Sequence, residues 1–231
     1  MDNKEDLLSK LAQTMIDGDD KAAAETAQAI VAAGIDVQEA IKQGAIKGLD
    51  ILGERFQRLE AFLPELIRAG DTMKACMAVF KPHIKPEHST EMDLGDVVIG
   101  TVKGDAHDIG KNIVANMLAA SGFEIHDLGF DVPVSRFVEE AEKNKAKIIA
   151  LSSLLTQSSY YQKQVIDYLR DAGVRDKYFV IIGGAPVSPE WAIEIQADGY
   201  ARTAVGATQI AKKLVTGGAT PPLSQPIIIN E

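Results

Sequence analysis

The chain has 231 residues, of which 46% are hydrophobic and 25% charged, as in ordinary globular proteins. Its formal net charge of −9 argues against nucleic acid as a partner, because binding to phosphates needs a basic face. No apolar stretch approaches the roughly 20 residues of a membrane-spanning helix, and the charged N-terminus does not resemble a signal peptide. The single cysteine, Cys76, excludes an intramolecular disulfide and fits a reducing cytoplasm.

The first 80 residues are predicted to be helical. Apolar residues recur at helical spacing from Leu7 to Met15, and further helices are predicted over residues 22–33, 37–52 and 65–80. Four helices of this length favour a small antiparallel bundle over residues 1–88. Residues 81–90 contain two prolines and few apolar residues, so we expect an exposed linker there.

Beyond the linker, short apolar runs alternate with amphipathic segments. Strands are predicted over residues 97–102, 124–128, 148–151 and 179–182, with a last strand that ends at Tyr200-Ala201, and helices over residues 109–121, 134–143, 160–172, 188–195 and 204–215. Near-continuous apolar strands separated by helices indicate a parallel sheet that is covered on both faces. We therefore predict an α/β domain over residues 89–217, with a doubly wound (Rossmann- or flavodoxin-like) sheet of five strands. Residues 218–231 are expected to form an irregular tail.

The loop after the first of these strands carries the most informative residues of the chain. It reads Asp105-Ala106-His107-Asp108-Ile109-Gly110, and it lies where open α/β folds bind ligands, at the carboxyl edge of the sheet. An aspartate two residues from a histidine can accept a hydrogen bond from one ring nitrogen, which leaves the other nitrogen free for a metal. A polar loop that caps the next helix, with Asp108 as the N-cap, is the alternative interpretation.

Two further loops are expected at the same edge. The buried strand over residues 148–151 is followed by a segment rich in hydroxyl groups, residues 152–156. Another strand ends in the pair Gly183-Gly184. Glycine in such a place commonly marks close approach of a ligand to the main chain, although a tight turn between strand and helix also explains it.

Taken together, these residues carry a resemblance to a known family. Asp105-x-His107-x-x-Gly110, then 41 residues, Ser152-x-Leu154, then 28 residues and Gly183-Gly184 resembles the cobalamin-binding signature of corrinoid methyltransferase proteins. The run over residues 104–114 is similar to the cobalamin module of methionine synthase, and the helical region to the cap domain of that family. The resemblance covers nearly all of residues 1–215.

The resemblance implies a cofactor and a set of residues that hold it. Cobalamin would bind base-off and His-on, with His107 as the lower ligand to cobalt, Asp105 holding the other ring nitrogen and Ser158 extending the relay. The loop and a slot for the nucleotide tail would supply further contacts: Gly104, Ala106, Asp108, Ile109, Gly110, Ser152, Leu154, Thr156, Gly183, Gly184, Tyr200 and Ala201. Phe56, Leu63 and Leu66 would cover the upper face of cobalt, although their spacing alone favours an ordinary bundle core.

The implied function is that of a methyl carrier without substrate specificity of its own. As cob(I)alamin the cofactor would take a methyl group from a substrate-specific methyltransferase. As methylcobalamin it would deliver that group to an acceptor methyltransferase that uses tetrahydrofolate or a thiol. A reductive activase would be a third partner. The sequence leaves open whether the donor is a methylamine, methanol, a betaine or an aryl methyl ether.

Three other interpretations share parts of this pattern. A cobalamin-binding regulatory or sensor protein would need a DNA-binding module, for which the chain has neither room nor basic charge. In a small subunit of an adenosylcobalamin isomerase, the cap-like helices would be unexpected. A flavodoxin-like scaffold without cobalt would fail to take up added cobalamin.

Overall fold

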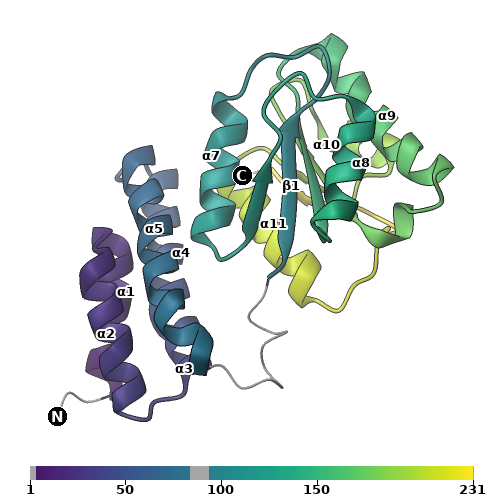
Figure 1. The fold of residues 1–231 in the computed structure, drawn as a ribbon. Coiled ribbons are helices and arrows are strands. Elements are labelled where there is room, and N and C mark those ends of the chain that lie inside the picture. Colours follow the sequence, from purple (N-terminus) through teal and green to yellow (C-terminus); the bar gives the residue numbers. More distant parts are fainter. Residues whose placement is uncertain (1–3, 84–93, 231) are drawn as a thin grey trace. The chain divides into compact units, whose positions relative to one another are not determined.

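The structure is a computed structural model that describes residues 4–83 and 94–230 (Figure 1). The chain divides into two compact units, one of Met1–Asp93 with Ala119–Gly122 and one of Leu94–Leu118 with Phe123–Glu231. No helix within the described ranges is long and apolar enough to cross a membrane. Of the predicted linker, Lys81–His83 forms a short 3₁₀ helix, η2, and the rest lies outside the described residues.

The first unit is helical, as predicted. Its elements are α1 (Lys4–Asp17), α2 (Asp20–Ala32), α3 (Val37–Ala40), the π-helix η1 (Ile41–Ile46), α4 (Lys47–Gln57) and α5 (Leu63–Phe80). The predicted third helix runs without a break from α3 through η1 into α4. Asp19 caps α2 by accepting a hydrogen bond from the N–H of Ala22 at 2.9 Å, as N-cap residues do. A Cβ at Gly48 would lie 2.3 Å from the carbonyl oxygen of Ala12, so this glycine lets the third helix pack closely on α1.

The interior of this bundle is apolar. Leu11, Met15, Ile30 and Phe80 are fully buried, and α2 packs along α5. Cys76 lies in the same core, and its burial raises the pKa of its thiol to about 12. The thiol is therefore uncharged at neutral pH and behaves as a small apolar side chain.

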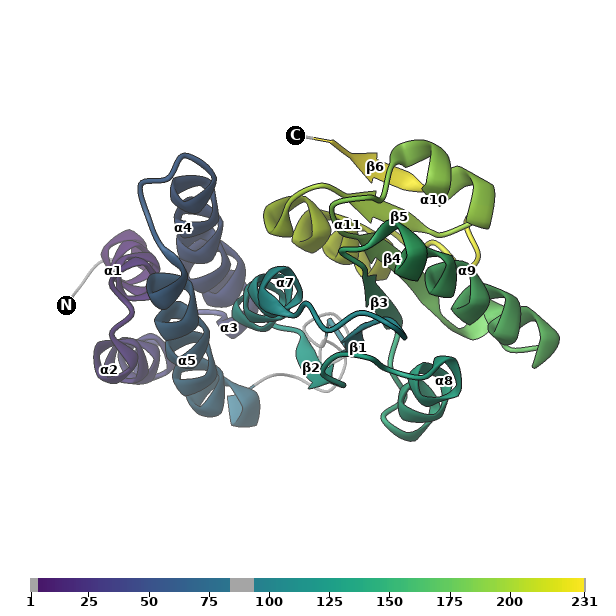
Figure 2. The same ribbon diagram turned by 90° about the horizontal axis from the view of Figure 1, so that it is seen from above.

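The second unit is built on a parallel sheet of six strands in the order β2-β1-β3-β4-β5-β6 (Figure 2). The strands are β1 (Asp96–Thr101), β2 (Glu124–Asp127), β3 (Ile148–Ser152), β4 (Phe179–Gly183), β5 (Gly199–Ala201) and β6 (Ile227–Ile229). The prediction of five strands and an irregular tail is wrong in one respect, because the tail supplies β6. That strand pairs with β5 in the register Gly199↔Ile227. Three residues are too few to show strand periodicity in a sequence, and the partner strand supplies the hydrogen bonds that order them.

Helices cover both faces of this sheet, as the prediction of a doubly wound domain requires (Figure 2). Their bounds are α7 (Ile109–Ala120), α8 (Val134–Lys143), α9 (Thr156–Asp171), α10 (Pro189–Ile195) and α11 (Ala204–Thr216). One core cluster joins the sheet to α8, α9 and α10, and the other joins it to α7 and α11. Successive strand residues alternate between the clusters, so Val98 faces the first and Val97 the second.

The start of α9 differs from the prediction in a way that matters for the site. The sequence predicted a helix from residue 160, but α9 begins at Thr156. Serine and threonine are unfavourable in helix interiors, so their abundance after β3 indicates a loop, although the same residues are favourable where a helix begins. Ser158 consequently lies in the first turn of α9, where its position is fixed by the helix.

The buried carboxylate of Asp198 links the C-terminal tail to the edge of the sheet at which the strands begin. Arg175, in the short helix η4 (Arg175–Lys177), lies 2.7 Å from Asp198, just before β5. The same carboxylate accepts the N–H of Val180 at 2.6 Å and the N–H of Leu223 at 2.7 Å. Asp198 thus connects η4, β4, β5 and the segment that leads into β6.

Candidate cofactor site at the carboxyl edge of the sheet

The loop between β1 and α7 carries the candidate ligand, His107. The hydroxyl of Thr101, at the end of β1, donates to the carbonyl oxygen of His107 at 2.8 Å, and the N–H of Asp105 donates to the carbonyl oxygen of Val102 at 3.3 Å. The carbonyl oxygen of Asp108 accepts the N–H of Asn112 at 2.8 Å as α7 begins. The main chain of Asp108 therefore begins α7, and the loop also fixes the main chain at the histidine.

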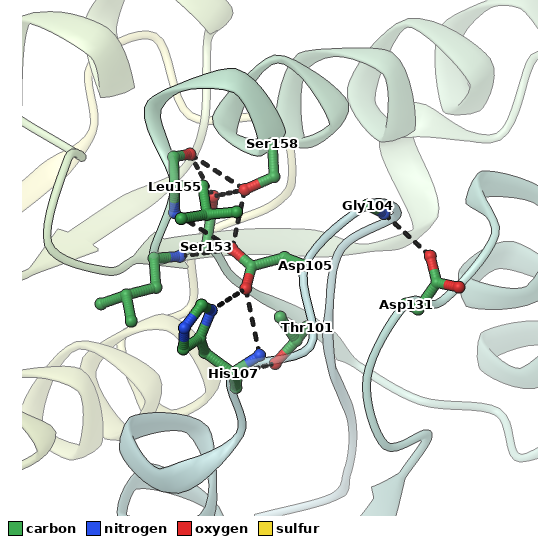
Figure 3. A network of polar contacts seen from close by, with 9 residues as sticks. Thr101, Gly104, Asp105, His107, Asp131, Ser153, Leu155 and Ser158 are labelled. Atoms are coloured by element: carbon green, nitrogen blue, oxygen red, sulfur yellow. Dashed lines mark hydrogen bonds and ion pairs between the residues drawn. The ribbon is translucent and has the colours of Figure 1, made fainter.

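The buried carboxylate of Asp105 is the centre of the site (Figure 3). One of its oxygens, Oδ1, lies 2.7 Å from Nδ1 of His107 and accepts the main-chain N–H of His107 at 3.1 Å. The other, Oδ2, accepts the N–H groups of Leu154 and Leu155 at 2.7 and 3.1 Å and the hydroxyl of Ser158 at 2.7 Å. Five donors thus converge on one carboxylate.

This environment keeps Asp105 ionised. Burial alone would raise the pKa of the carboxyl group, but the hydrogen bonds from Ser158, from His107 and from the N–H of Leu154 outweigh it. Together they hold the pKa of Asp105 well below its usual range. Since an ionised carboxylate can only accept hydrogen bonds, the proton of the neutral imidazole resides on Nδ1 of His107.

The second ring nitrogen of His107 is left available. Nε2 then carries a lone pair, and within residues 4–83 and 94–230 no group hydrogen-bonds to it. The His107 side chain is 53% exposed. This is the arrangement in which a histidine binds a metal, with a carboxylate fixing the tautomer and the orientation of the ring.

The structure adds Ser153, which the sequence analysis did not single out. Its side chain is fully buried, and its Oγ lies 2.7 Å from Oγ of Ser158. The carbonyl oxygen of Leu155 also lies within hydrogen-bond distance of both hydroxyls, at 3.1 and 2.9 Å. Because each hydroxyl has a single proton, a chain in which Ser153 donates to Ser158 and Ser158 donates to Asp105 forms in place of the bonds to Leu155. The only sequence signal for this role was the presence of two adjacent serines after a buried strand.

The glycine pair at the end of β4 adjoins the same segment. The N–H of Ser153 donates to the carbonyl oxygen of Gly183 at 3.1 Å. A Cβ at Gly184 would lie only 1.7 Å from the carbonyl oxygen of Ser153, and the φ angle of this residue is +126°. The close approach at Gly184 is thus made by the protein's own main chain, and contact of the pair with a cofactor stays a prediction.

The side chain of a buried glutamine forms hydrogen bonds to the main chain beside this glycine pair. Gln162 donates to the carbonyl oxygens of Leu151 and Gly183, each at 3.1 Å. Its own side-chain oxygen accepts the indole N–H of Trp191, also at 3.1 Å. One side chain of α9 therefore joins the ends of β3 and β4 to α10.

The other predicted contact residues differ in accessibility. Ile109 is 76% exposed, and Leu154 and Leu155 are also exposed, so apolar surface lies beside His107. The remaining predicted residues of the loop and slot are exposed or partly exposed: Gly104, Ala106, Asp108, Gly110, Ser152, Thr156, Gly183 and Gly184. Tyr200 and Ala201 are buried in the two cores of the sheet. Their side chains therefore present little surface to a cofactor, because packing against helices occupies them.

The predicted cap residues also differ from one another. Phe56 is partly exposed, whereas Leu66 is only 3% exposed and packs in the helical core, as its spacing alone favoured. The side chain of Leu63 lies outside the described part of the structure. Two side chains that were not predicted, Leu59 and Phe62, are the exposed apolar residues between α4 and α5. Contact of any of these with a cofactor stays a prediction.

Comparisons with known proteins agree with the resemblance. Two sequence profiles, each described as a B12 binding domain, match residues 95–209 and 7–81. The chain is 43% identical over 204 residues to trimethylamine corrinoid protein 1 of Methanosarcina acetivorans. The aligned region covers 88% of this chain and 94% of that protein. It is also 40% identical over 210 residues to a corrinoid protein of Desulfitobacterium hafniense, and that alignment covers 90% of this chain and 97% of the relative.

Solved structures show the same fold. A cobalamin-binding protein from Desulfitobacterium hafniense has a TM-score of 0.70 at 36% identity, over 89% of this chain and 97% of that one. A chain of the methanol:cobalamin methyltransferase complex from Methanosarcina barkeri has a TM-score of 0.75 at 28% identity, over 94% and 82%.

The fold and the matched domains define a cobalamin-binding protein with a helical cap domain and a Rossmann-like domain. More narrowly, the chain belongs to the family of corrinoid proteins that are components of methyltransferase systems. Its cofactor is cobalamin.

The residues at this edge fit that cofactor. His107 offers one nitrogen ligand, and among the described residues no group of three or more His, Cys, Asp or Glu side chains could hold a metal ion by themselves. A cobalt held in a corrin ring needs only one axial ligand from the protein, which Nε2 of His107 can supply. Exposed Ile109 and Leu154 offer apolar surface to such a ring, and a Cβ at Gly110 would meet no atom within 4 Å.

Proposed function

We propose that this protein binds cobalamin base-off and His-on and carries a methyl group between two partner enzymes. The observation that carries the proposal is the contact of 2.7 Å between Asp105 and Nδ1 of His107, which leaves Nε2 of an exposed imidazole free to ligate cobalt. Bound cobalamin supplies a metal centre that can accept and release a methyl group.

Asp105 and the two serines act on the ring of His107. The carboxylate holds the proton on Nδ1 and orients the ring, and Ser158 and Ser153 hold the carboxylate in turn. Nε2 lies on an exposed side chain and is the atom that would ligate cobalt. The ionised carboxylate of Asp105 would keep the ring in the orientation that presents this nitrogen.

The two domains would divide the remaining tasks. In our proposal residues 89–217, completed by β6, form the binding domain, with the loop 104–110 and the segment 152–156 against the corrin ring and its nucleotide tail. Residues 1–88 form the cap, with Phe56 and Leu63 as the proposed contacts over cobalt. The single cysteine, Cys76, supports a reducing cytoplasm as the location.

The names of the relatives support a methyl donor and one of the proposed partners. Proteins 43% and 42% identical to this chain are named trimethylamine and dimethylamine corrinoid proteins, so we infer that a methylamine is the donor. The similar chain in a methyltransferase complex supports a substrate-specific methyltransferase as the first partner. An acceptor methyltransferase with tetrahydrofolate or a thiol, and a reductive activase, complete the proposed system.

The proposal is tested by adding cobalamin to the purified cofactor-free protein. We expect uptake with a base-off spectrum, and in the cobalt(II) state an electron paramagnetic resonance signal split by a histidine nitrogen. His107→Gly should lose that splitting and bind cobalamin at least about tenfold more weakly, since outer-shell changes alone already cost 10–100-fold at metal sites. His83→Gly, an exposed histidine in η2, is the control. Unchanged splitting in His107→Gly would contradict the assignment.

A further inference from the structure

Asp131 bonds to the main chain of the histidine loop at Gly104 and Asp105 (Figure 3). It lies in the connection between β2 and α8. Its Oδ1 accepts the N–H of Gly104 at 2.8 Å, and its carboxylate lies 3.0 Å from Nζ of Lys103. Its own N–H donates to the carbonyl oxygen of Asp105 at 2.9 Å.

These contacts complete the fixation of Asp105. The carboxylate of Asp105 is held by Leu154, Leu155 and Ser158, which come from the connection between β3 and α9. Its main chain is held by Asp131, through the carbonyl oxygen of Asp105 itself and the N–H of the preceding residue. Since both ends of the side chain are then fixed, the carboxylate has one orientation from which to meet Nδ1 of His107.

The main chain around Asp131 pairs with the end of β1 and so extends the parallel sheet. Thr101 donates its N–H to the carbonyl oxygen of Gly129 at 2.9 Å, and Val132 donates to the carbonyl oxygen of Thr101 at 3.0 Å. Val102 and Val132 form a parallel bridge. Residues 129–132 thus run beside the start of the histidine loop, and Asp131 is the one described residue of that run whose side chain also bonds to the loop.

From this arrangement we infer that Asp131 is a positioning residue for the cobalt ligand His107. It acts through Gly104 and Asp105 and touches neither His107 nor, in our proposal, the cofactor. The part of the inference that concerns cobalt rests on the proposed function, whereas the part that concerns the loop does not.

The residue type suits the place. Asp131 has a φ angle of +53°, in the left-handed region that aspartate, asparagine and glycine tolerate better than other residues. The substitution Asp131→Asn would keep an acceptor for the N–H of Gly104 but lose the charge that faces Lys103. The substitution Asp131→Gly would keep the backbone conformation but lose both contacts. The two variants therefore separate the hydrogen bond from the ion pair without backbone strain.

The first experiment uses the protein without cofactor and measures hydrogen exchange of single main-chain amides by NMR. In Asp131→Gly we expect the Gly104 amide to exchange at least about tenfold faster, as for loss of one hydrogen bond to a charged group. The His107 amide, which donates to Asp105, should also exchange faster. Asp131→Asn and Lys103→Ala should stay within about threefold of the wild type, because an exposed ion pair contributes little.

Asp176→Ala, an exposed aspartate of η4 at the opposite edge of the sheet, is the matched control and should leave both amides unchanged. An unchanged Gly104 amide in Asp131→Gly would overturn the inference. So would a change that is confined to Gly104 and leaves the His107 amide as in the wild type, because the contact would then not reach the imidazole.

The second experiment uses the protein with cobalamin in the cobalt(II) state. The fraction of molecules with the histidine splitting should fall in Asp131→Gly and be restored in Asp131→Asn. Equal fractions in both variants and the wild type would overturn the positioning role. If the wild type itself lacks the splitting, the proposed His-on function fails, while the exchange experiment still decides whether Asp131 holds the loop.

Discussion

At the scale of single residues, the sequence predicted which side chains lie together around His107 but only part of what holds them. Asp105, His107 and Ser158 meet as expected. Ser153 and Asp131 belong to the same network but were missed, since a buried hydroxyl pair or a contact between loops 27 positions apart leaves no periodic signal. The burial of Leu66, Tyr200 and Ala201 could not be predicted from the sequence either, because tertiary packing decides which apolar side chains are covered.

Asp105 should make the stability of the protein depend on pH. Its pKa is ordinarily 3.8 and is lower in the folded state, so its ionised form stabilises the fold above about pH 4. That contribution is lost as the pH falls below this value toward the lower folded pKa. In Asp105→Asn an amide N–H₂ group would face N–H donors. We expect the free energy of unfolding to fall by about 1–3 kcal/mol at pH 7.

The measurement for this prediction is urea unfolding of wild type and Asp105→Asn between pH 8 and pH 3. We expect the difference in unfolding free energy to be constant above pH 5 and to shrink below about pH 4. A difference that grows on acidification would show that the sign is wrong.

At the scale of elements, boundaries were predicted best where burial dominates. The strands β1, β3 and β4 match within two residues, because strands buried on both faces are near-continuously apolar. The partly buried β2 and the amphipathic α8 match equally well. The start of α9 and the strand β6 were missed, where hydroxyl groups or a short length conceal the element.

The junction of β4 with the segment after β3 gives a sharp test at this scale. In Gly184→Ala the new Cβ would collide with the carbonyl oxygen of Ser153, so the segment that holds Asp105 must move. We expect loss of stability well above the roughly 1–2 kcal/mol of backbone strain alone, together with weaker cobalamin uptake. Chemical denaturation and spectroscopic titration measure the two effects.

Gly173→Ala is the matched control for this substitution. Gly173 also has a positive φ angle, +68°, but a Cβ there would meet nothing within 4 Å. It should therefore show the strain alone, with normal cobalamin uptake. Equal losses in the two variants would mean that the contact with Ser153 is unimportant.

At the scale of the whole molecule, the class of fold was predictable, because strand and helix alternate throughout the second unit. The attachment of the tail was not, since it depends on Asp198, whose partners in η4 and the tail are separated from it by 23 and 25 positions.

Removal of the Asp198 carboxylate should destabilise the sheet strongly. Asp198→Ala leaves the buried guanidinium of Arg175 without its partner, which typically costs about 3–5 kcal/mol. Glu140→Ala breaks the more exposed pair with Lys143 and should lower the stability far less, because solvent screens that pair. Urea unfolding compares the two, and Asp198→Asn serves if the alanine variant does not fold. Similar costs for both pairs would contradict the role assigned to Asp198.

The hydrogen bond from Trp191 to Gln162 places a fluorescent side chain near the candidate cofactor site. Trp191 is the chain's single tryptophan, and Gln162 links its indole to the carbonyl oxygens that end β3 and β4. Corrins absorb light in the region where indoles emit it, so a corrin bound at that edge would quench the fluorescence by energy transfer. Emission from this one side chain therefore follows cofactor loading without any label, and the quenched fraction reads out occupancy during titration.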